Sequence, residues 1–248
     1  MNRNLKALGL ALLAVFATTA VLASAAQAQL AKVTVSPSPA WLTAEVIEHP
    51  NIGRVETFKL ESGQPIWCED SSTATVKNGD TSITVVPTFD KCTAVIGTED
   101  HFVTFTMNDC DFLWHGGETA SPGSSTFIKG QVDLLCPTGK EVEVHLYKSP
   151  TTETEELCTY KIAPFVNKGN NEFHNVGTGS TNDVTITHTV TGITITRTGS
   201  LLCGAASQNL TFTGSTTIKA FEDKAGSISG GTVSGLSEGN QSSVTISD

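Results

Sequence analysis

Apolar and polar residues alternate with a period of two along most of this chain after residue 30, and Gly, Pro, Asn and Asp separate the alternating runs. In the run at 184–198, β-branched residues occupy both faces, which favours strand over helix. Together the runs predict strands at 82–87, 157–163, 183–190, 193–197 and 208–221. We therefore expect an all-β protein, a single antiparallel β-sandwich or flattened barrel.

One hairpin is predicted nearly residue by residue. The segments 102–107 and 110–115 flank Asn108 and Asp109, two residues that tolerate the positive φ angles of a type I′ turn. A two-residue loop in this register puts six apolar side chains on one face: Val103, Phe105, Met107, Cys110, Phe112 and Trp114. We expect this face to lie in the core, with a buried, structural role for Trp114.

A second hairpin is predicted around the three-residue loop 137–139, in which Gly139 takes the left-handed conformation. Its register places Val132 and Leu134 on the apolar face, opposite Val144 and Val142.

The outer face of that second hairpin would bring Asp133 opposite Glu143, beside Glu141. Like charges opposite one another are slightly unfavourable. A calcium ion would relieve the repulsion, but a solvated face with nearby lysines is the preferred interpretation, so no metal or other cofactor is expected.

The N-terminus is typical of a secretory leader. Arg3 and Lys6 precede an apolar run at 8–22, and the A-x-A pattern at 26–28 suits a signal peptidase. An N-terminal membrane helix is the alternative, which the shortness of the run disfavours. We therefore expect a secreted, extracellular protein.

Three segments follow from the leader and the composition: a signal peptide at 1–28, a β-sandwich domain at 29–222 and a Gly/Ser-rich tail at 223–248. We expect the tail to be dispensable for folding. Residues 243–246 are the exception, since they could add one edge strand to the sheet.

Charge limits the partners. The full chain has a net charge of −10, and without Arg3 and Lys6 the 13 remaining Lys and Arg stand against 25 Asp and Glu, giving −12. No basic stripe remains to neutralise phosphates, so nucleic acid and anionic membranes are poor candidates. A cell-surface component or a glycan remains open as partner, and the mature form has no predicted membrane span.

Six cysteines follow the leader, at Cys68, Cys92, Cys110, Cys136, Cys158 and Cys203. An even number in an exported chain predicts three disulfides, for which fifteen pairings exist. Proximity in sequence favours Cys92 with Cys110 and Cys136 with Cys158, which leaves Cys68 for Cys203, although a meander would separate Cys136 from Cys158. The chain has no C-x-x-C spacing that would indicate a zinc site, and the even number of cysteines leaves no free thiol that would indicate a nucleophile.

Few residues suggest catalysis. The G-x-S-x-G pattern at 235–239 lies in the Gly/Ser-rich tail without a later histidine, so chance explains it better than a nucleophile elbow. A small secreted hydrolase would have to draw its acid or base from His101, His115, Asp111 or Glu118. His115 and Asp111, side by side on the outer face, are the strongest candidates for catalytic residues under that alternative.

Several motifs carry a resemblance: Phe89-Asp90-Lys91-Cys92, Met107-Asn108-Asp109-Cys110, the segment 132–137, and Gly192-Ile193-Thr194-Ile195 before Cys203. With the leader, they resemble uncharacterised secreted six-cysteine β-protein paralogues of high-GC Gram-positive soil bacteria. The resemblance implies a bacterial extracellular β-protein and supplies no activity or site. We expect a non-enzymatic surface-associated binding or structural protein, with no catalytic residues assigned and the hydrolase as alternative.

Overall fold

The computed structural model describes residues 31–36, 38–46, 56–119, 127–177, 183–222, 228–229, 232–233 and 241–247. The leader and the G-x-S-x-G pattern lie outside these residues. In the part of the chain that is described, no helix is long and apolar enough to cross a membrane. The elements are β1 (Lys32–Ser36), β2 (Ala40–Val46), β3 (Glu56–Leu60), β4 (Pro65–Val76), β5 (Ser82–Ile96), β6 (Glu99–Thr106), β7 (Asp111–Thr119), β8 (Phe127–Leu135), β9 (Val142–Tyr147), β10 (Glu156–Ile162), β11 (Phe165–Val176), β12 (Asp183–Gly199), the short 3₁₀ helix η1 (Leu201–Cys203), β13 (Ser207–Glu222), β14 (Ile228–Ser229), β15 (Thr232–Val233) and β16 (Gln241–Ser247).

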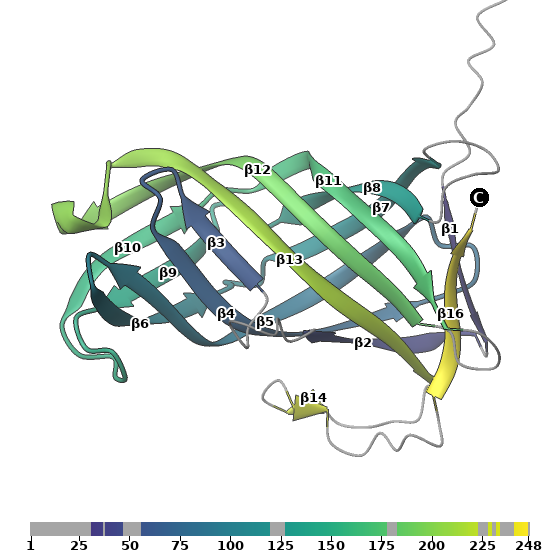
Figure 1. Cartoon of the computed structure of the whole chain (residues 1–248). Coiled ribbons are helices and arrows are strands. Elements are labelled where there is room, and N and C mark those ends of the chain that lie inside the picture. The colour runs from purple at the N-terminus through teal and green to yellow at the C-terminus, as the bar shows by residue number, and fades with distance from the viewer. Residues whose placement is uncertain are drawn as a thin grey trace, which may run out of the picture.

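The described strands form one large antiparallel sheet that closes on itself, with β14 and β15 paired separately. Four long strands, β4, β5, β12 and β13, run along the length of the molecule (Figure 1). β4 pairs directly with β5 and β12 with β13, and each remaining position around the barrel is filled by two strands that follow one another end to end, namely β2 with β3, β6 with β7, β9 with β8, and β10 with β11. The prediction of an all-β sandwich or flattened barrel is confirmed.

Both predicted turns are present, but both predicted hairpins are wrong. Asn108 and Asp109 have φ angles of 52° and 62°, and Gly139 has 75°. However, β6 and β7 both pair with β5, at residues 92–96 and 82–85 respectively. Likewise β8 pairs with β7 and β11, whereas β9 pairs with β6 and β10. Each turn therefore connects two strands placed end to end, instead of two neighbours.

The predicted faces hold despite the wrong pairing, because inward and outward positions alternate along each strand whichever neighbour it has. Val103, Cys110, Phe112 and Trp114 are buried. Phe105 and Met107 are partly buried against the same core.

All six cysteines are joined, as Cys68–Cys92, Cys110–Cys136 and Cys158–Cys203. The pairing expected from proximity in sequence is wrong, because the disulfides follow the strand register. Cys68 and Cys92 lie on the paired strands β4 and β5. Cys110 and Cys136 adjoin the residue pair Asp111–Leu135. Cys158 lies opposite Gly199 at the end of β12, and the short helix η1, which follows β12, places Cys203 within bonding distance of Cys158.

Replacing both Cys158 and Cys203 with alanine should lower the free energy of unfolding by about 2–4 kcal/mol, since the disulfide closes a long loop in the unfolded chain. Urea denaturation of the double variant measures the loss. Thiol titration of the denatured, unreduced wild-type protein is the companion measurement, and finding two free thiols there would contradict the assignment.

The C-terminal tail contributes a strand that includes the expected segment 243–246, but this strand, β16, lies between β1 and β13 and not at the edge of the sheet. β16 pairs with β1 along its length and with the end of β13. In Figure 1, β1 and β16 lie together at the right-hand end of the molecule. Val33 and Val35 of β1 are buried, opposite Ile246 and Val244 in the register. Part of the segment 223–248 thus belongs to the sheet.

We therefore expect deletion of residues 224–248 to destabilise the protein, in place of the dispensable tail inferred from composition. Without β16, β1 loses the strand with which it pairs along its length, so Val33 and Val35 should no longer be held in the core. This should lower the free energy of unfolding by roughly 3 kcal/mol, because each buried valine contributes about 1.5–3 kcal/mol. Urea denaturation of the truncated protein tests this, and an unchanged midpoint and slope would show that β16 adds nothing.

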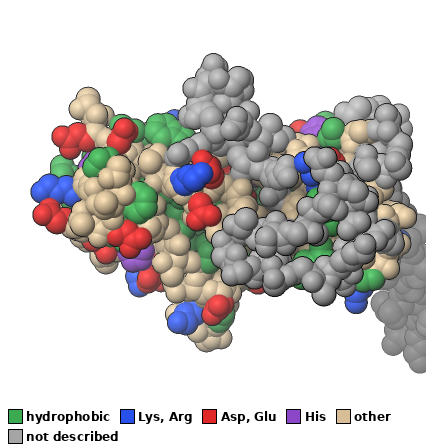
Figure 2. Space-filling model, turned by 90° about the horizontal axis from the view of Figure 1, so that it is seen from below, with side chains coloured by type: hydrophobic (Ala, Val, Ile, Leu, Met, Phe, Trp, Pro, Cys, Tyr) green, Lys and Arg blue, Asp and Glu red, His purple; other side chains and the backbone are tan. Residues whose placement is uncertain are grey.

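Five phenylalanines pack together where the split strands meet: Phe58, Phe89, Phe105, Phe112 and Phe212. The rings of Phe58 and Phe212 are stacked with centroids 4.4 Å apart. On one side of this cluster the interior is apolar, with a cavity of only about 10 Å³. The other side contains a larger cavity with polar groups in its walls. Outside the barrel, acidic and basic side chains are interspersed on the face in Figure 2.

Candidate functional site

Polar side chains occupy inward positions on four strands that surround the larger cavity. Alternation along β12 turns His188 inward between Ile186 and Val190, and alternation along β13 turns Thr216 inward between Phe212 and Ile218. β4 contributes Asp70 and Ser72 to the cavity wall. β3 contributes Glu56, which is fully buried. Buried polar groups are costly unless they are paired, so their contacts decide what the site can do.

Glu56 is the centre of these contacts. One carboxyl oxygen lies 2.8 Å from Nε2 of His188, and the other accepts a hydrogen bond of 2.9 Å from the Thr216 hydroxyl. Gly214 leaves room for this carboxyl, because a Cβ there would lie 2.1 Å from Oε2 of Glu56. The pair is therefore built into the barrel, and Nδ1 of His188 is left buried without a hydrogen-bond partner.

The cavity beside this pair has a volume of about 40 Å³, counted as space for the centre of a water-sized sphere. One water needs about 10–15 Å³ on that measure, so the cavity has room for a small molecule or a few waters. Its walls are mostly apolar and aromatic, and its polar groups come from few positions. The lining consists of Asp70, Ser72, Val85, Phe89, Phe112, Trp114, Ile186, His188, Phe212, Thr216 and Ile218.

Asp70 is the most perturbed acid of the site. Burial, and then the neighbouring Glu56 carboxyl, raise the pKa of Asp70 to about 8. The hydroxyl of Ser72 donates to Asp70 at 3.0 Å, which opposes this shift in pKa without cancelling it. At neutral pH the Asp70 carboxyl therefore carries a proton and can act as a hydrogen-bond donor inside the barrel.

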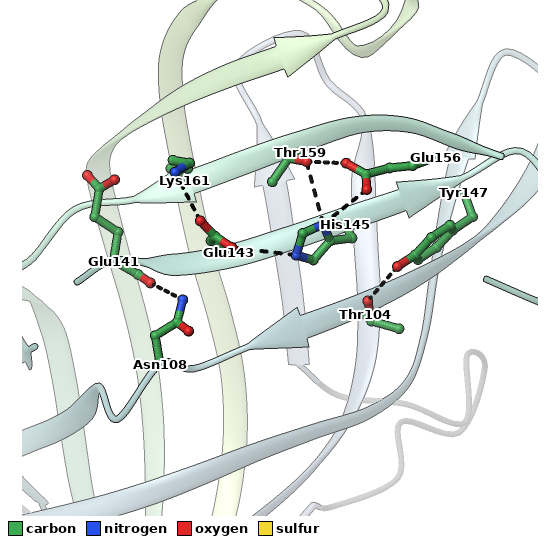
Figure 3. Close-up of polar contacts among 9 residues, drawn as sticks. All are labelled: Thr104, Asn108, Glu141, Glu143, His145, Tyr147, Glu156, Thr159 and Lys161. Atoms are coloured by element: carbon green, nitrogen blue, oxygen red, sulfur yellow. Dashed lines mark hydrogen bonds and ion pairs between the residues drawn. The ribbon is translucent and has the colours of Figure 1, made fainter. Parts of the chain in front are cut away.

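A second polar cluster lies on the outer face of β9 and β10 (Figure 3). Its centre is His145, with Nδ1 3.5 Å from the Thr159 hydroxyl and Nε2 3.8 Å from a Glu143 carboxyl oxygen. The Thr159 hydroxyl donates to Glu156 instead. Lys161 holds Glu143 at 2.9 Å, and this contact is the first cause of the lowered pKa of Glu143.

This outer cluster has a hydroxyl, an imidazole and carboxylates, but not the geometry of a catalytic triad. A nucleophile and its base lie within about 2.6–3.2 Å of one another, and both distances at His145 are longer. The Thr159 hydroxyl also gives its proton to Glu156. A solvated salt-bridge network on a sheet surface accounts for these contacts.

The residues proposed for a hydrolase are not brought together. His115 contacts Asp133 of β8 at 3.2 Å, while Asp111 lies four residues before His115 on β7. His101 is buried and bonded to the Tyr147 carbonyl oxygen at 3.0 Å. Glu118 belongs to β7, and its side chain lies outside the described positions.

The expected cross-strand contact of Asp133 with Glu143 is also wrong, since β8 and β9 do not pair. Asp133 accepts hydrogen bonds from His115 and from the Asn167 amide, whereas Glu143 bonds to Lys161. Within the described residues, no group of three or more His, Cys, Asp or Glu side chains is arranged to hold a metal ion.

Comparisons of the chain with protein families, with curated proteins and with solved structures find no match. The interior site therefore rests on its geometry. Sequence reasoning missed it, although one signal was present: His188 and Thr216 interrupt inward rows of apolar residues. A polar residue on the apolar face of a strand indicates a buried polar contact, but the sequence does not show which strand supplies its partner.

Proposed function

We propose that this chain is a secreted, non-enzymatic binding protein whose barrel encloses a small-molecule site. The observation that carries the proposal is the cavity of about 40 Å³, with apolar and aromatic walls, a few convergent polar groups and an unpartnered nitrogen on His188. Pre-formed apolar pockets with few polar groups are the usual form of small-molecule sites. The perturbed pKa of Asp70 in the same wall supports this location.

An extracellular, bacterial setting is part of the proposal. The leader and the resemblance to secreted six-cysteine proteins support it, and three disulfides are consistent with an oxidising compartment. Binding is favoured over hydrolysis because the described histidines serve structural contacts, either buried in the barrel or within salt bridges on its surface.

A fragment screen of the mature protein tests the site. We expect small, mostly apolar molecules with one polar group to raise the melting temperature. At a ligand concentration a hundredfold above Kd, the added free energy of unfolding should be about 3 kcal/mol. Binding should also change the fluorescence of Trp114, which lies in the cavity wall. The matched control is Val85→Phe, which fills the cavity from the same wall. A ligand that stabilises wild-type protein and Val85→Phe equally would place binding outside the cavity. The proposal would also be overturned if the fragment screen gave no ligand and only a glycan array showed binding.

A further inference from the structure

Acidic groups outnumber basic groups around the cavity. Asp70 lines the cavity from β4, and the carboxyl groups of Glu56 on β3 and Asp90 on β5 are both near enough to act on its charge. The cationic candidate among the lining residues is His188 of β12, and it is already engaged by Glu56. Among the described residues that line the cavity, none is a lysine or arginine.

Hydrogen-bond acceptors also predominate among the polar groups of the cavity wall. The Asp70 carboxylate, when ionised, and the Ser72 hydroxyl oxygen are acceptors, and a neutral His188 that donates from Nε2 to Glu56 has an acceptor at Nδ1. Nδ1 is buried without a partner. A ligand group that only donates would satisfy these atoms together.

The rings in the wall favour a positive charge. Phe89, Phe112, Phe212 and Trp114 all line the cavity, and His188 itself lies against Trp114 and Phe212 with centroid distances of 5.5 and 4.3 Å. The face of an aromatic ring attracts an organic cation, and the attraction is larger when the cation is desolvated. The Asp70 carboxyl group and a mostly aromatic and aliphatic wall form a site for an ammonium group with a short apolar body.

We propose, building on the function proposed above, that the cavity binds a small protonated amine, with the ammonium group against Asp70 and Nδ1 of His188 and its alkyl part against the aromatic wall. The ammonium charge stabilises the ionised form of Asp70. Because Asp70 holds a proton at neutral pH in the empty site, binding of the cation transfers that proton to the solvent.

Titration calorimetry with three probes of similar shape tests this ligand class: isopropylamine, the neutral 2-propanol and the anionic isobutyrate. We expect isopropylamine to bind about tenfold or more tighter than 2-propanol, because it adds charge attraction and cation–π contacts, and isobutyrate not to bind. Repeating the isopropylamine titration at pH 7 in buffers of different ionisation enthalpy should show release of close to one proton per amine bound, falling toward zero at pH 9.

Asp70→Asn should remove the preference for isopropylamine and the proton release while 2-propanol still binds. Asp100→Asn, the same substitution at an exposed position of β6, is the matched control and should change neither. Proton release is measured on the wild-type protein, so the test does not depend on the folding of any variant.

The outcomes separate the two proposals. Equal binding of isopropylamine and 2-propanol, or amine binding without proton release, would overturn the amine assignment and leave the cavity as a binding site. Failure of all three probes, together with a fragment screen that finds no ligand blocked by Val85→Phe, would overturn the binding function itself.

Discussion

The stability of this protein should fall as the pH rises from about 4 to about 8, and the Asp70→Asn variant should lose most of that dependence. Burial and the Glu56 carboxyl raise the pKa of Asp70 to about 8 in the folded state, from its ordinary value of 3.8. Between these two values the folded protein holds a proton that the unfolded chain has released. The free energy of unfolding therefore decreases by up to about 1.4 kcal/mol per pH unit, on the order of 5 kcal/mol in all, and levels off above pH 8.

Urea denaturation of wild-type protein and Asp70→Asn at several pH values between 4.5 and 9 measures this effect. Asparagine keeps the size of the side chain and cannot ionise, so the variant should gain stability relative to wild type as the pH rises. Glu56 and Asp90 act on the charge of Asp70 from other strands, and His188 lines the same cavity; both proteins contain these groups. Asp100→Asn is the control for loss of one exposed carboxylate. A difference between wild type and Asp70→Asn that stays flat across this range would show that Asp70 is not held protonated.

The period-two pattern predicted many of the strands and their faces, but it did not yield strands at β1, β2, β3, β4 or β11. Alternation along β12 and β13 follows directly from the residues, and the two regions expected at 183–190 and 193–197 form one continuous strand. The pair Asn108 and Asp109 was correctly assigned positive φ angles. These features are local, since each depends on the conformational preferences of a few neighbouring residues.

Strand pairing could not be predicted in the same way. A tight turn at 108–109 is compatible with a hairpin, and here it links β6 to β7 along one edge of β5 instead. Nothing in the turn residues distinguishes the two outcomes. The disulfide pairing failed for the same reason, because each bridge reports which strands are neighbours rather than which cysteines are close in sequence.

The interior site depends on the longest-range contacts of all. Glu56 and His188 are 132 residues apart, and Glu56 and Thr216 are 160 apart. They meet because β3 and β12 pair with opposite edges of β13, where Gly214 leaves space for a carboxyl group. Sequence spacing does not reveal such a cluster, whereas the outer candidates around His115 were visible because their residues are close in the chain.

Replacement of Trp114 by alanine should lower the free energy of unfolding by about 3–5 kcal/mol. Trp114 is 7% exposed, lies opposite Ile83 and Val132 on the neighbouring strands, and packs edge-on against Phe112 and Phe173. Truncation removes these contacts and enlarges the cavity, since the surrounding closed barrel cannot collapse fully into the space.

Trp114→Phe and Trp67→Ala complete the test of this role. Phenylalanine retains most of the apolar volume, so Trp114→Phe should lose well under half as much stability. Trp67 points outward between buried Ile66 and Cys68 on β4 and is only partly buried, so its truncation should also cost less. Urea denaturation of the three variants gives the ranking. If Trp114→Ala kept the wild-type stability but lost ligand binding, Trp114 would be a ligand contact without a structural role, and the packing assigned to it would be wrong.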